Sequence, residues 1–307
     1  MKVYRGLNEL PSRGVETAVT IGNFDGVHRG HLRVIDKLKD HARRKDAVPA
    51  AITFDPHPQK LFRGEAPPAL VTQGRKLALL GEAGIERVLI LKFTRKLSLV
   101  EPEEFIEQVL VKEMKAKAVV VGTAFRFGYK ARGDVTMLRT YGRRLGFSFE
   151  GVRLAKLGGK SVSSTEVRHA IVHGDVEWAA RALGRPHAIG GRIVKGKKRG
   201  KGLGFPTANL APDAGICLPG IGIYAGRVIL GAREMIAALS VGTNPTFGER
   251  NPLSIEAHIL DFDGDLYGRD VHFEFVRYLR GEMAFNSPEA LSAQIERDVA
   301  LTRELIR

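Results

Sequence analysis

Two histidines, His28 and His31, are spaced so that both can face one anion at the start of a helix. The segment 22–31 joins a short apolar run to a run with helical periodicity, and Gly30 lets the backbone approach a ligand closely. Free amides and the dipole of a helix N-terminus favour phosphate, and an imidazole beside phosphate can stay protonated and donate. Fixed donors of this kind stabilise the charge that develops when an oxygen attacks the α-phosphorus of a nucleotide.

The same pair of histidines also suits an exposed helix surface or a zinc site. Zinc is disfavoured because no cysteine and no suitable carboxylate lies close in the sequence. The strand, glycine-rich turn and helix around the pair therefore favour a phosphate site.

A second candidate for phosphate binding lies at 163–168. Ser164 and Thr165 offer hydroxyls and free amides, and Arg168 adds a delocalised cation. Taken alone, Ser163 or Ser164 is better explained as an ordinary N-cap.

Alternating strands and helices are predicted to position the histidines. Strand-like apolar runs occur at 18–21, 50–54, 88–91 and 119–121, with helical patterns between them. This alternation predicts an α/β domain with a parallel sheet, whose ligands bind at the carboxyl ends of the strands.

The pattern of residues in the sequence changes beyond residue 186. Short β-type runs dominate at 222–230, 255–260 and 271–275, which favours an antiparallel sheet or small barrel. A final helix is predicted from Ser287, an N-cap followed by proline. We therefore expect two domains, 1–185 and 186–307.

Composition narrows the class of protein. Hydrophobic residues make up 44% of the 307 positions and charged residues 27%, which are globular values, and no apolar run approaches the length of a membrane span. The start lacks the apolar stretch of a secretory signal, and the single cysteine, Cys217, suits a reducing cytosol. We expect a cytoplasmic protein without a membrane partner. The formal net charge of +14 favours acidic partners, although a solvated basic surface explains most of it.

Four segments of the first part resemble, in order, those of the prokaryotic bifunctional riboflavin kinase/FAD synthetases. They are 22–31 with the HxGH motif, 53–58, 125–128 leading to Gly133, and 163–168, which is similar to an SSTxIR signature. The resemblance implies a Rossmann-like HxGH nucleotidyltransferase domain in which His28 and His31 are catalytic. The implied ATP- and phosphate-binding residues of this domain are Gly22, Asn23, Phe24, Asp25, Gly26, Gly30, Arg126, Ser164, Thr165 and Arg168. The implied flavin-binding residues are Phe54, Asp55, His57, Pro58, Phe62 and Phe125.

One residue departs from the family pattern. Ala124 stands where the family usually carries Asp or Asn, so a polar contact with flavin or ATP is expected to be missing there. The hydroxyl of Thr123 is close enough in sequence to compensate.

The segment 204–209 resembles the GFPTAN motif of riboflavin kinases. Mg²⁺ prefers hard oxygen ligands, and the resemblance implies that Thr207 and Asn209 supply two while ATP phosphates complete the charge. Gly204 and Pro206 are implied to contact ATP. The basic, glycine-rich stretch 191–202 would form a flap over the phosphates. Lys195 and Gly202 are its implied ATP-binding residues, although a basic loop or an RNA patch explains the individual lysines equally well.

The segment 255–262 also matches the family and implies that Glu256 is the base that takes the proton from the riboflavin 5′-hydroxyl. A carboxylate on an otherwise apolar strand is hard to explain by packing. The alternating pattern around Glu256 does not decide which way the residue faces.

The resemblance covers nearly the whole chain. It implies that the second domain converts riboflavin and ATP to FMN and ADP, and that the first converts FMN and ATP to FAD and pyrophosphate, both with Mg²⁺. One alternative is another HxGH nucleotidyltransferase whose barrel only binds ligand. A second is a basic RNA-binding module, which is disfavoured because aromatic residues make up only 7% and show no clustering. A homo-oligomer is left open.

Overall fold

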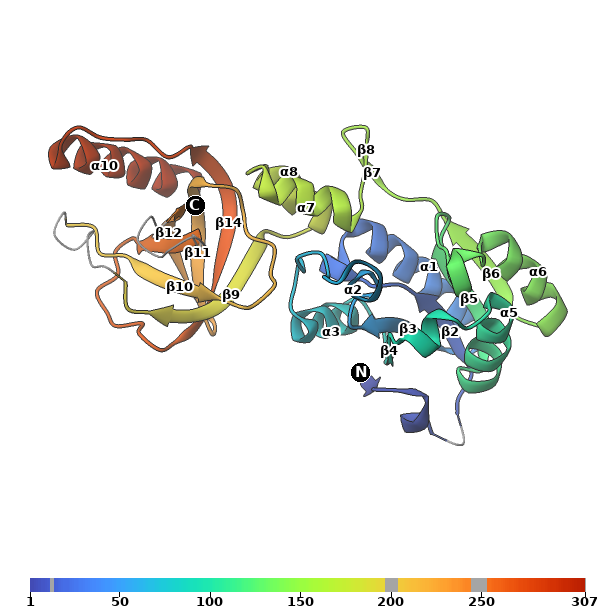
Figure 1. Ribbon diagram of the computed structural model, residues 1–307. Coiled ribbons are helices and arrows are strands. Elements are labelled where there is room, and N and C mark those ends of the chain that lie inside the picture. The colour runs from blue at the N-terminus through green and yellow to red at the C-terminus, as the bar shows by residue number, and fades with distance from the viewer. Residues whose placement is uncertain (12–13, 197–203, 244–252, 307) are drawn as a thin grey trace. The chain divides into compact units, whose positions relative to one another are not determined.

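The computed structural model describes residues 1–11, 14–196, 204–243 and 253–306 (Figure 1). The chain divides into two compact units. The first comprises Met1–Ala69 and Gln73–Ser163, and the second comprises Leu70–Thr72 and Ser164–Arg307. Each unit has its own sheet and its own core.

The first unit is built on a six-stranded sheet in which every pairing is parallel. In spatial order its strands are β1 (Lys2–Tyr4), β4 (Arg87–Lys92), β3 (Val48–Asp55), β2 (Thr17–Ile21), β5 (Ala116–Gly122) and β6 (Ser148–Val152). All five residues of β2 are buried, so both faces of the central strand are covered. The parallel sheet expected from the alternating pattern is confirmed.

The helices of the first unit connect these strands. They are α1 (Arg29–Lys45), α2 (Pro58–Arg63), α3 (Gln73–Glu82), α4 (Arg95–Ser98), α5 (Pro102–Glu104) with the π-helical segment η3 (Phe105–Glu113), and α6 (Val135–Leu145). Short 3₁₀ segments η1 (Leu7–Glu9), η2 (Asp25–Val27) and η4 (Tyr129–Ala131) and the hairpin β7–β8 (Lys156–Leu157, Lys160–Ser161) complete the unit. In α1 the buried residues are Gly30, Val34, Ile35, Leu38 and Ala42, and this face packs on β2 and β5.

The order of the sheet reverses at β2. This strand pairs with β3 on one side and with β5 on the other, so the connections leaving β2 and β5 run in opposite directions. Parallel sheets bind ligands in the crevice that such a reversal opens at the carboxyl ends of the strands. The turn 22–27, which follows β2, lies at this point.

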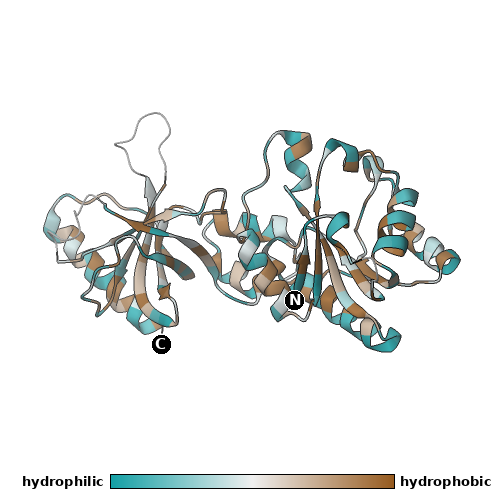
Figure 2. Cartoon of the chain, turned by 90° about the horizontal axis from the view of Figure 1, so that it is seen from below, coloured by the Kyte–Doolittle hydropathy of each residue, from teal (hydrophilic) through white to brown (hydrophobic). Residues whose placement is uncertain are grey.

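The second unit contains a closed antiparallel barrel. Its strands, in spatial order, are β10 (Ala208–Pro212), β13 (Leu253–Ile259), β12 (Arg233–Thr243), β11 (Gly222–Leu230), β14 (Asp270–Arg280) and β9 (His187–Val194), which pairs back with β10. The fully buried rings of Tyr224, Phe273 and Phe275 contribute to its core. The helix α10 (Pro288–Leu305) packs on β11 and β12, so the expected barrel with a terminal helix is confirmed. Figure 2 shows apolar residues concentrated in the strands of both units.

Two helices that lie between the sheet and the barrel along the chain belong to the second unit. α8 (Val176–Leu183), which follows α7 (Ser164–Val172), packs on β14 and β9, and Glu177 forms an ion pair with Arg277 at 2.7 Å. The expected domain 1–185 would place α8 with the parallel sheet. Its buried face, which includes Trp178, instead belongs to the unit that contains the barrel. A functional boundary at 185/186 stays a prediction. Within the described ranges, no helix has the length and apolar character needed to cross a membrane.

The packing of α8 predicts where the barrel can be cut. A fragment 164–307 should be more stable than a fragment 187–307, because the shorter one loses the buried side chains of Val176, Trp178 and Leu183. Burial of each large apolar side chain stabilises by roughly 1.5–3 kcal/mol. Urea unfolding followed by circular dichroism would measure the difference. Equal free energies of unfolding for the two fragments would show that α8 does not stabilise the barrel.

Candidate active sites

The turn between β2 and α1 has an unusual backbone. Phe24, Gly26 and Val27 adopt positive φ values of 50°, 78° and 39°, and all three are buried. Positive φ is costly for Phe and Val and tends to mark functional turns. The turn directs the chain into α1 so that His28 becomes the N-cap of the helix.

His28 and His31 form a compact pair. The backbone N–H of His31 donates to Nδ1 of His28 at 3.3 Å, and the two rings stack with centroids 3.7 Å apart. Because Nδ1 of His28 accepts a hydrogen bond, the ring carries its proton on Nε2. A Cβ on Gly30 would lie 3.0 Å from the His28 ring and from the Val162 carbonyl oxygen, so only glycine leaves the ring undisturbed.

The surroundings of His31 disfavour its positively charged form. Burial holds the pKa of His31 well below its usual range, and the neighbouring His28 and Lys76 lower it further. Its Nδ1 is buried and has no hydrogen-bond partner among the residues that the structure describes. A neutral His31 with a vacant ring nitrogen is suited to acquire a proton when an anion binds, rather than to hold one beforehand.

A buried lysine that the sequence analysis missed lies beside this turn. Lys76 of α3 is 8% exposed, and its Nζ donates to the carbonyl oxygen of Asn23 at 3.3 Å and to Oγ1 of Thr53 at 3.4 Å. The sequence held a signal for it, because Lys76 occupies the same helix face as the buried Leu79 and Leu80. A charged residue in an apolar stripe needs partners, and these are at the ends of β2 and β3.

Asn23 also contacts the next loop. Its side-chain nitrogen lies 3.0 Å from Nε2 of His57, and its buried side-chain oxygen has no partner in the described part of the chain. His57 accepts from the backbone N–H of Gln59 as the N-cap of α2. The residues expected after β2 and β3 are therefore brought together, with Asp55 ending β3.

An aromatic cavity of about 780 Å³ opens next to the turn. Of the expected residues, those that line it are Gly22, Asn23, Phe54, Pro58, Phe62, Phe125 and Arg126. Phe93, Phe105, Phe127 and Tyr129, which the sequence analysis missed, also line it, and Ala124 contributes to the wall. The rings of Phe125 and Phe127 stack with centroids 5.6 Å apart. A large cavity with aromatic walls suits a flat, mostly apolar ring system.

The other expected residues of this site are less closely placed. Asp55, His57, His28 and His31 do not line the aromatic cavity. Arg126 is exposed, with NH1 3.9 Å from Oδ2 of Asp134. Ser164, Thr165 and Arg168 form the start of α7 in the second unit, so their expected role toward His28 stays a prediction.

In the second unit, Glu256 faces the outside of the barrel. On β13 the neighbours Ile255 and Ala257 are buried in the interior, and Glu256 alternates with them. The hydroxyl of Thr207 donates to one carboxylate oxygen at 2.9 Å, and that of Ser254 donates to the other at 3.0 Å. The strand pairing thus answers the question of direction that the sequence left open.

The GFPTAN segment is fixed to the same strand. Asn209 pairs with Glu256 in the register of β10 and β13, and Nδ1 of His258 donates to the carbonyl oxygen of Pro206 at 2.9 Å. A Cβ on Gly196, two residues beyond the end of β9, would lie 2.2 Å from Nδ2 of Asn209, so a side chain there would displace the amide. Gly204 has a φ of 85°, and Lys195 is exposed. Gly202 lies outside the described residues.

Thr207 and Glu256 line a second cavity, of about 610 Å³, on the outer face of the barrel. Ala238 and Ser240 of β12 and Leu291 and Ile295 of α10 form opposite walls. The cavity therefore lies between the barrel and its terminal helix. Asn209 does not line it.

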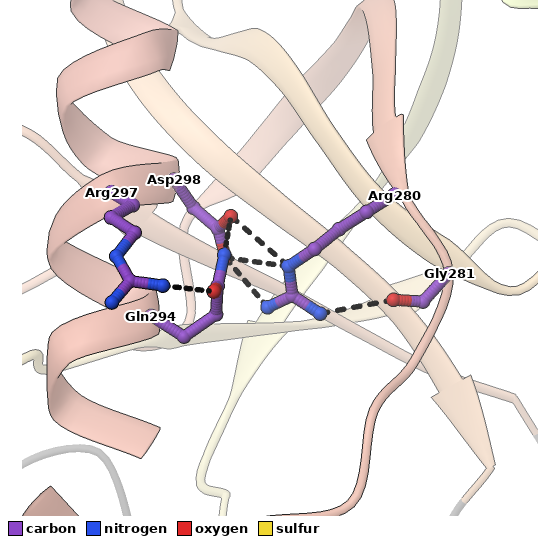
Figure 3. A network of polar contacts seen from close by, with 5 residues as sticks. All are labelled: Arg280, Gly281, Gln294, Arg297 and Asp298. Carbon is purple, nitrogen blue, oxygen red and sulfur yellow. Dashed lines mark hydrogen bonds and ion pairs between the residues drawn. The ribbon is translucent and has the colours of Figure 1, made fainter. Parts of the chain in front are cut away.

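A buried ion pair attaches α10 beside this cavity (Figure 3). Arg280, at the end of β14, donates to both oxygens of Asp298, with the shortest contact at 2.6 Å, and also to the carbonyl oxygen of Gly281. Asp298 is 6% exposed and accepts a further bond from Gln294 at 3.0 Å. The sequence analysis missed this network, although Arg280 at the end of an apolar strand was a signal for it.

The available oxygen donors fit Mg²⁺. The Thr207 hydroxyl, the Asn209 amide and the Glu256 carboxylate are hard ligands grouped on adjacent strands and the segment before them. In the described part of the chain, no group of three or more His, Cys, Asp or Glu side chains could hold a metal by itself. A cation here would therefore need further ligands, such as nucleotide phosphates.

Comparison with known proteins matches a separate family model to each unit and finds relatives that span both. A family model for FAD synthetase matches residues 11–166, and one for riboflavin kinase matches residues 183–306. The bifunctional riboflavin kinase/FMN adenylyltransferase of Escherichia coli K12 is 38% identical over 308 residues, covering 99% of this chain and 97% of the relative. A protein with the same description from Pseudomonas fluorescens is 36% identical, covering 99% and 98%.

A solved structure shares the fold over nearly the full length. It is described as a macrolide-efflux protein from Streptococcus pneumoniae, and it matches with a TM-score of 0.90 at 27% identity over 98% of each chain. Its description differs from those of the curated relatives, which agree with both family models. The two family models together match almost the entire sequence, and each matched region contains one of the two cavities described above. The chain therefore belongs to the family of bifunctional riboflavin kinases/FMN adenylyltransferases.

Proposed function

We propose that each unit performs one step of the family's reaction through the cavity described above. The chain phosphorylates riboflavin with ATP to give FMN and ADP, and transfers the adenylyl group of a second ATP to FMN to give FAD and pyrophosphate. The observation that best supports the residue assignment is the hydrogen bond from Thr207 to Glu256, which joins the implied metal ligand to the implied base at one cavity wall.

In the kinase step, Glu256 accepts the proton from the 5′-hydroxyl of riboflavin as that oxygen attacks the γ-phosphorus and ADP leaves. Thr207 and Ser254 orient the carboxylate by donating to its two oxygens. The isoalloxazine ring occupies the cavity between the barrel and α10.

Mg²⁺ bound with ATP would neutralise charge on the phosphates, and Thr207 and Asn209 would hold it. The Thr207 hydrogen is already donated to Glu256, which leaves the oxygen lone pairs for a cation. Gly204, Pro206 and Lys195 lie near this segment and are assigned to ATP, as is Gly202.

In the adenylyl step, the flavin ring binds in the aromatic cavity, and a phosphate oxygen of FMN attacks the α-phosphorus of ATP. His28 and His31 stabilise the charge that develops on the phosphoryl oxygens, and pyrophosphate leaves. The backbone of the turn 22–26 and Arg126 bind phosphates in this site, and Ser164, Thr165 and Arg168 are assigned to phosphate by their resemblance to the SSTxIR signature. Nucleic acid is not among the proposed partners. A cytosolic location stays a prediction from the sequence, and self-association stays open.

The two activities should separate by mutation. His31→Asn should slow FAD formation by roughly 10²- to 10³-fold, because a charge-stabilising donor is lost, while FMN formation continues. Glu256→Gln should stop FMN formation, while supplied FMN still becomes FAD. Chromatographic separation of riboflavin, FMN and FAD over time measures both steps.

Glu234→Gln is the matched control, since Glu234 is an exposed carboxylate on β12, and it should leave both activities unchanged. Loss of both steps in a folded His31→Asn protein would contradict the two-site assignment. Undiminished riboflavin phosphorylation by Glu256→Gln would remove that residue from the mechanism.

The ion pair between Arg280 and Asp298 predicts a selective effect on the kinase. Asp298→Asn should destabilise the second unit by on the order of 3 kcal/mol, because the buried Arg280 loses its counter-charge. The KM for riboflavin should rise, since α10 forms one wall of the cavity. Thermal unfolding and steady-state kinase assays measure the two effects.

Arg303→Met provides the comparison on the same helix. Its ion pair with Asp261 is exposed and screened by solvent, so it should contribute little to stability. Equal effects of Asp298→Asn and Arg303→Met would mean that the buried pair does not hold the cavity wall.

Ala124 predicts a gain of activity. Its position in the wall of the aromatic cavity means that Ala124→Asn would place a polar group against the flavin, as other members of the family do, and should speed FAD formation. Poor substrate placement can cost on the order of 10²-fold, so the gain should be visible in kcat/KM. Ala124→Val adds bulk without polarity and should not help. An Ala124→Asn protein no faster than the original would show that the alanine is neutral.

A further inference from the structure

A buried lysine of the first unit has no role in the mechanism above. Lys76 extends from α3 toward the carboxyl ends of β2 and β3, and only 8% of the residue is exposed to water. Placing an ammonium group in such surroundings costs several kcal/mol unless other groups compensate. Its presence therefore calls for an explanation beyond packing, which Leu or Met would provide at lower cost.

The contacts of Lys76 join two loops that carry proposed site residues. One bond goes to the backbone carbonyl oxygen of Asn23, in the turn after β2, and the other goes to Thr53, two residues before the end of β3. Thr53 in turn donates to the same Asn23 carbonyl at 3.3 Å. The three groups form a closed triangle that fixes the turn against β3.

The turn held in this way determines where two vacant polar atoms lie. The side-chain oxygen of Asn23 and Nδ1 of His31 are both buried and lack partners within the described ranges. Asn23 belongs to the triangle itself, and His31 follows the strained turn Phe24–Val27 on the first turn of α1. Unpartnered buried polar atoms are rare in native proteins and are explained here by a ligand that satisfies them.

Charged groups surround the ammonium group on several sides. Asp25 from η2 and Asp55 from the end of β3 attract it, and both raise the pKa of Lys76 against the larger lowering by burial. His31 from α1 lies close enough for the positive charge of Lys76 to lower the pKa of the imidazole, and His28, stacked on His31, lowers it as well. His57, which contacts Asn23, is the remaining titratable neighbour of the turn.

We propose that Lys76 is the positioning residue of the adenylyl-transfer site, tying the turn after β2 to β3 so that Asn23 and His31 face the nucleotide. This inference rests on the proposed function of the first unit. Lys76 reaches backbone and Thr53 rather than the cavity, which it does not line, so it acts through these residues. Burial and the neighbouring His28 keep His31 neutral, and the charge of Lys76 adds to both until the phosphates of ATP supply the opposite charge.

The sign of the expected pH effect follows from the charges. Lys76 carries a positive charge and lowers the pKa of His31, so removing that charge raises the pKa of His31. The midpoint at which His31 takes up a proton in the free protein should then move to higher pH.

The test compares three variants of the full chain. Lys76→Met removes the charge and the hydrogen bonds while keeping the length, Lys76→Arg keeps the charge, and Lys37→Met is the control at an exposed position of α1. The titration of the His31 ring is followed by NMR without substrate, and kcat/KM for FAD formation from FMN is measured against pH. FMN formation by the second unit is recorded in the same samples.

We expect Lys76→Met to move the His31 midpoint upward and to lower kcat/KM for FAD formation by on the order of 10²-fold. Lys76→Arg should retain a midpoint near that of the original protein, and Lys37→Met should change neither quantity. FMN formation should be equal in all of them. If Lys76→Met does not fold, Lys76→Gln, which keeps a donor without the charge, takes its place.

An unmoved His31 midpoint together with unchanged FAD formation in a folded charge-removing variant would overturn the inference. A lower kcat/KM with an unmoved midpoint and a uniform loss of stability would overturn it as well, since that pattern indicates a purely structural lysine. Failure of the proposed function looks different. In that case the original protein would convert no FMN to FAD, whereas the NMR midpoint, which needs no turnover, would still report on Lys76.

Discussion

The packed interiors of the parallel sheet and the barrel limit where this chain can bind its substrates. The central strand of the parallel sheet is buried on both faces, and the barrel is closed around aromatic side chains such as Tyr224 and Phe273. Neither sheet has room inside for a flavin. What remains is the end of the parallel sheet where its strand order reverses, and the outer face of the barrel beneath a helix. Both cavities lie at these places, so packing of the core fixes the location of the chemistry before any catalytic side chain is considered.

At both places the functional side chains are held by one another. Glu256 receives hydroxyl hydrogens from Thr207 and Ser254 on its two oxygens, and Nδ1 of His28 receives the backbone N–H of His31. Such bonds fix the orientation of these groups before substrate binds. Glycine at Gly30 and Gly196 serves the same end, since any side chain there would collide with His28 or Asn209. Hydrogen bonds and close packing therefore hold the proposed site residues of both units in place.

The sequence was most informative where a local pattern has a single physical solution. Strand and helix alternation predicted the parallel sheet, and the turn before α1 predicted that His28 and His31 lie together at the start of a helix. It was least informative where partners are distant in the chain. Lys76 contacts Asn23 and Thr53 only after β2, β3 and α3 have assembled, and Arg280 finds Asp298 only when α10 packs on the barrel. The aromatic wall is similar, since Phe93 and Tyr129 come from separate connections. Nor did the residue pattern reveal that α8 packs on the barrel, because the pattern of an amphipathic helix does not specify which sheet covers its apolar face.

The two sites manage the same substrate charge in different ways. ATP brings several negative charges to each, yet the side chains that donate to Glu256 are the neutral hydroxyls of Thr207 and Ser254, while the turn of the first unit is surrounded by histidines and backed by a lysine. A base must keep its negative charge to take a proton, so cationic side chains packed around Glu256 would weaken it, and a metal that arrives with ATP supplies positive charge only when the substrate is present. Adenylyl transfer as proposed uses no protein base, so cations built into the fold carry no such penalty. Fixed cations near the sheet and neutral oxygen ligands on the barrel are thus two solutions to one electrostatic problem, and the need for a base decides between them.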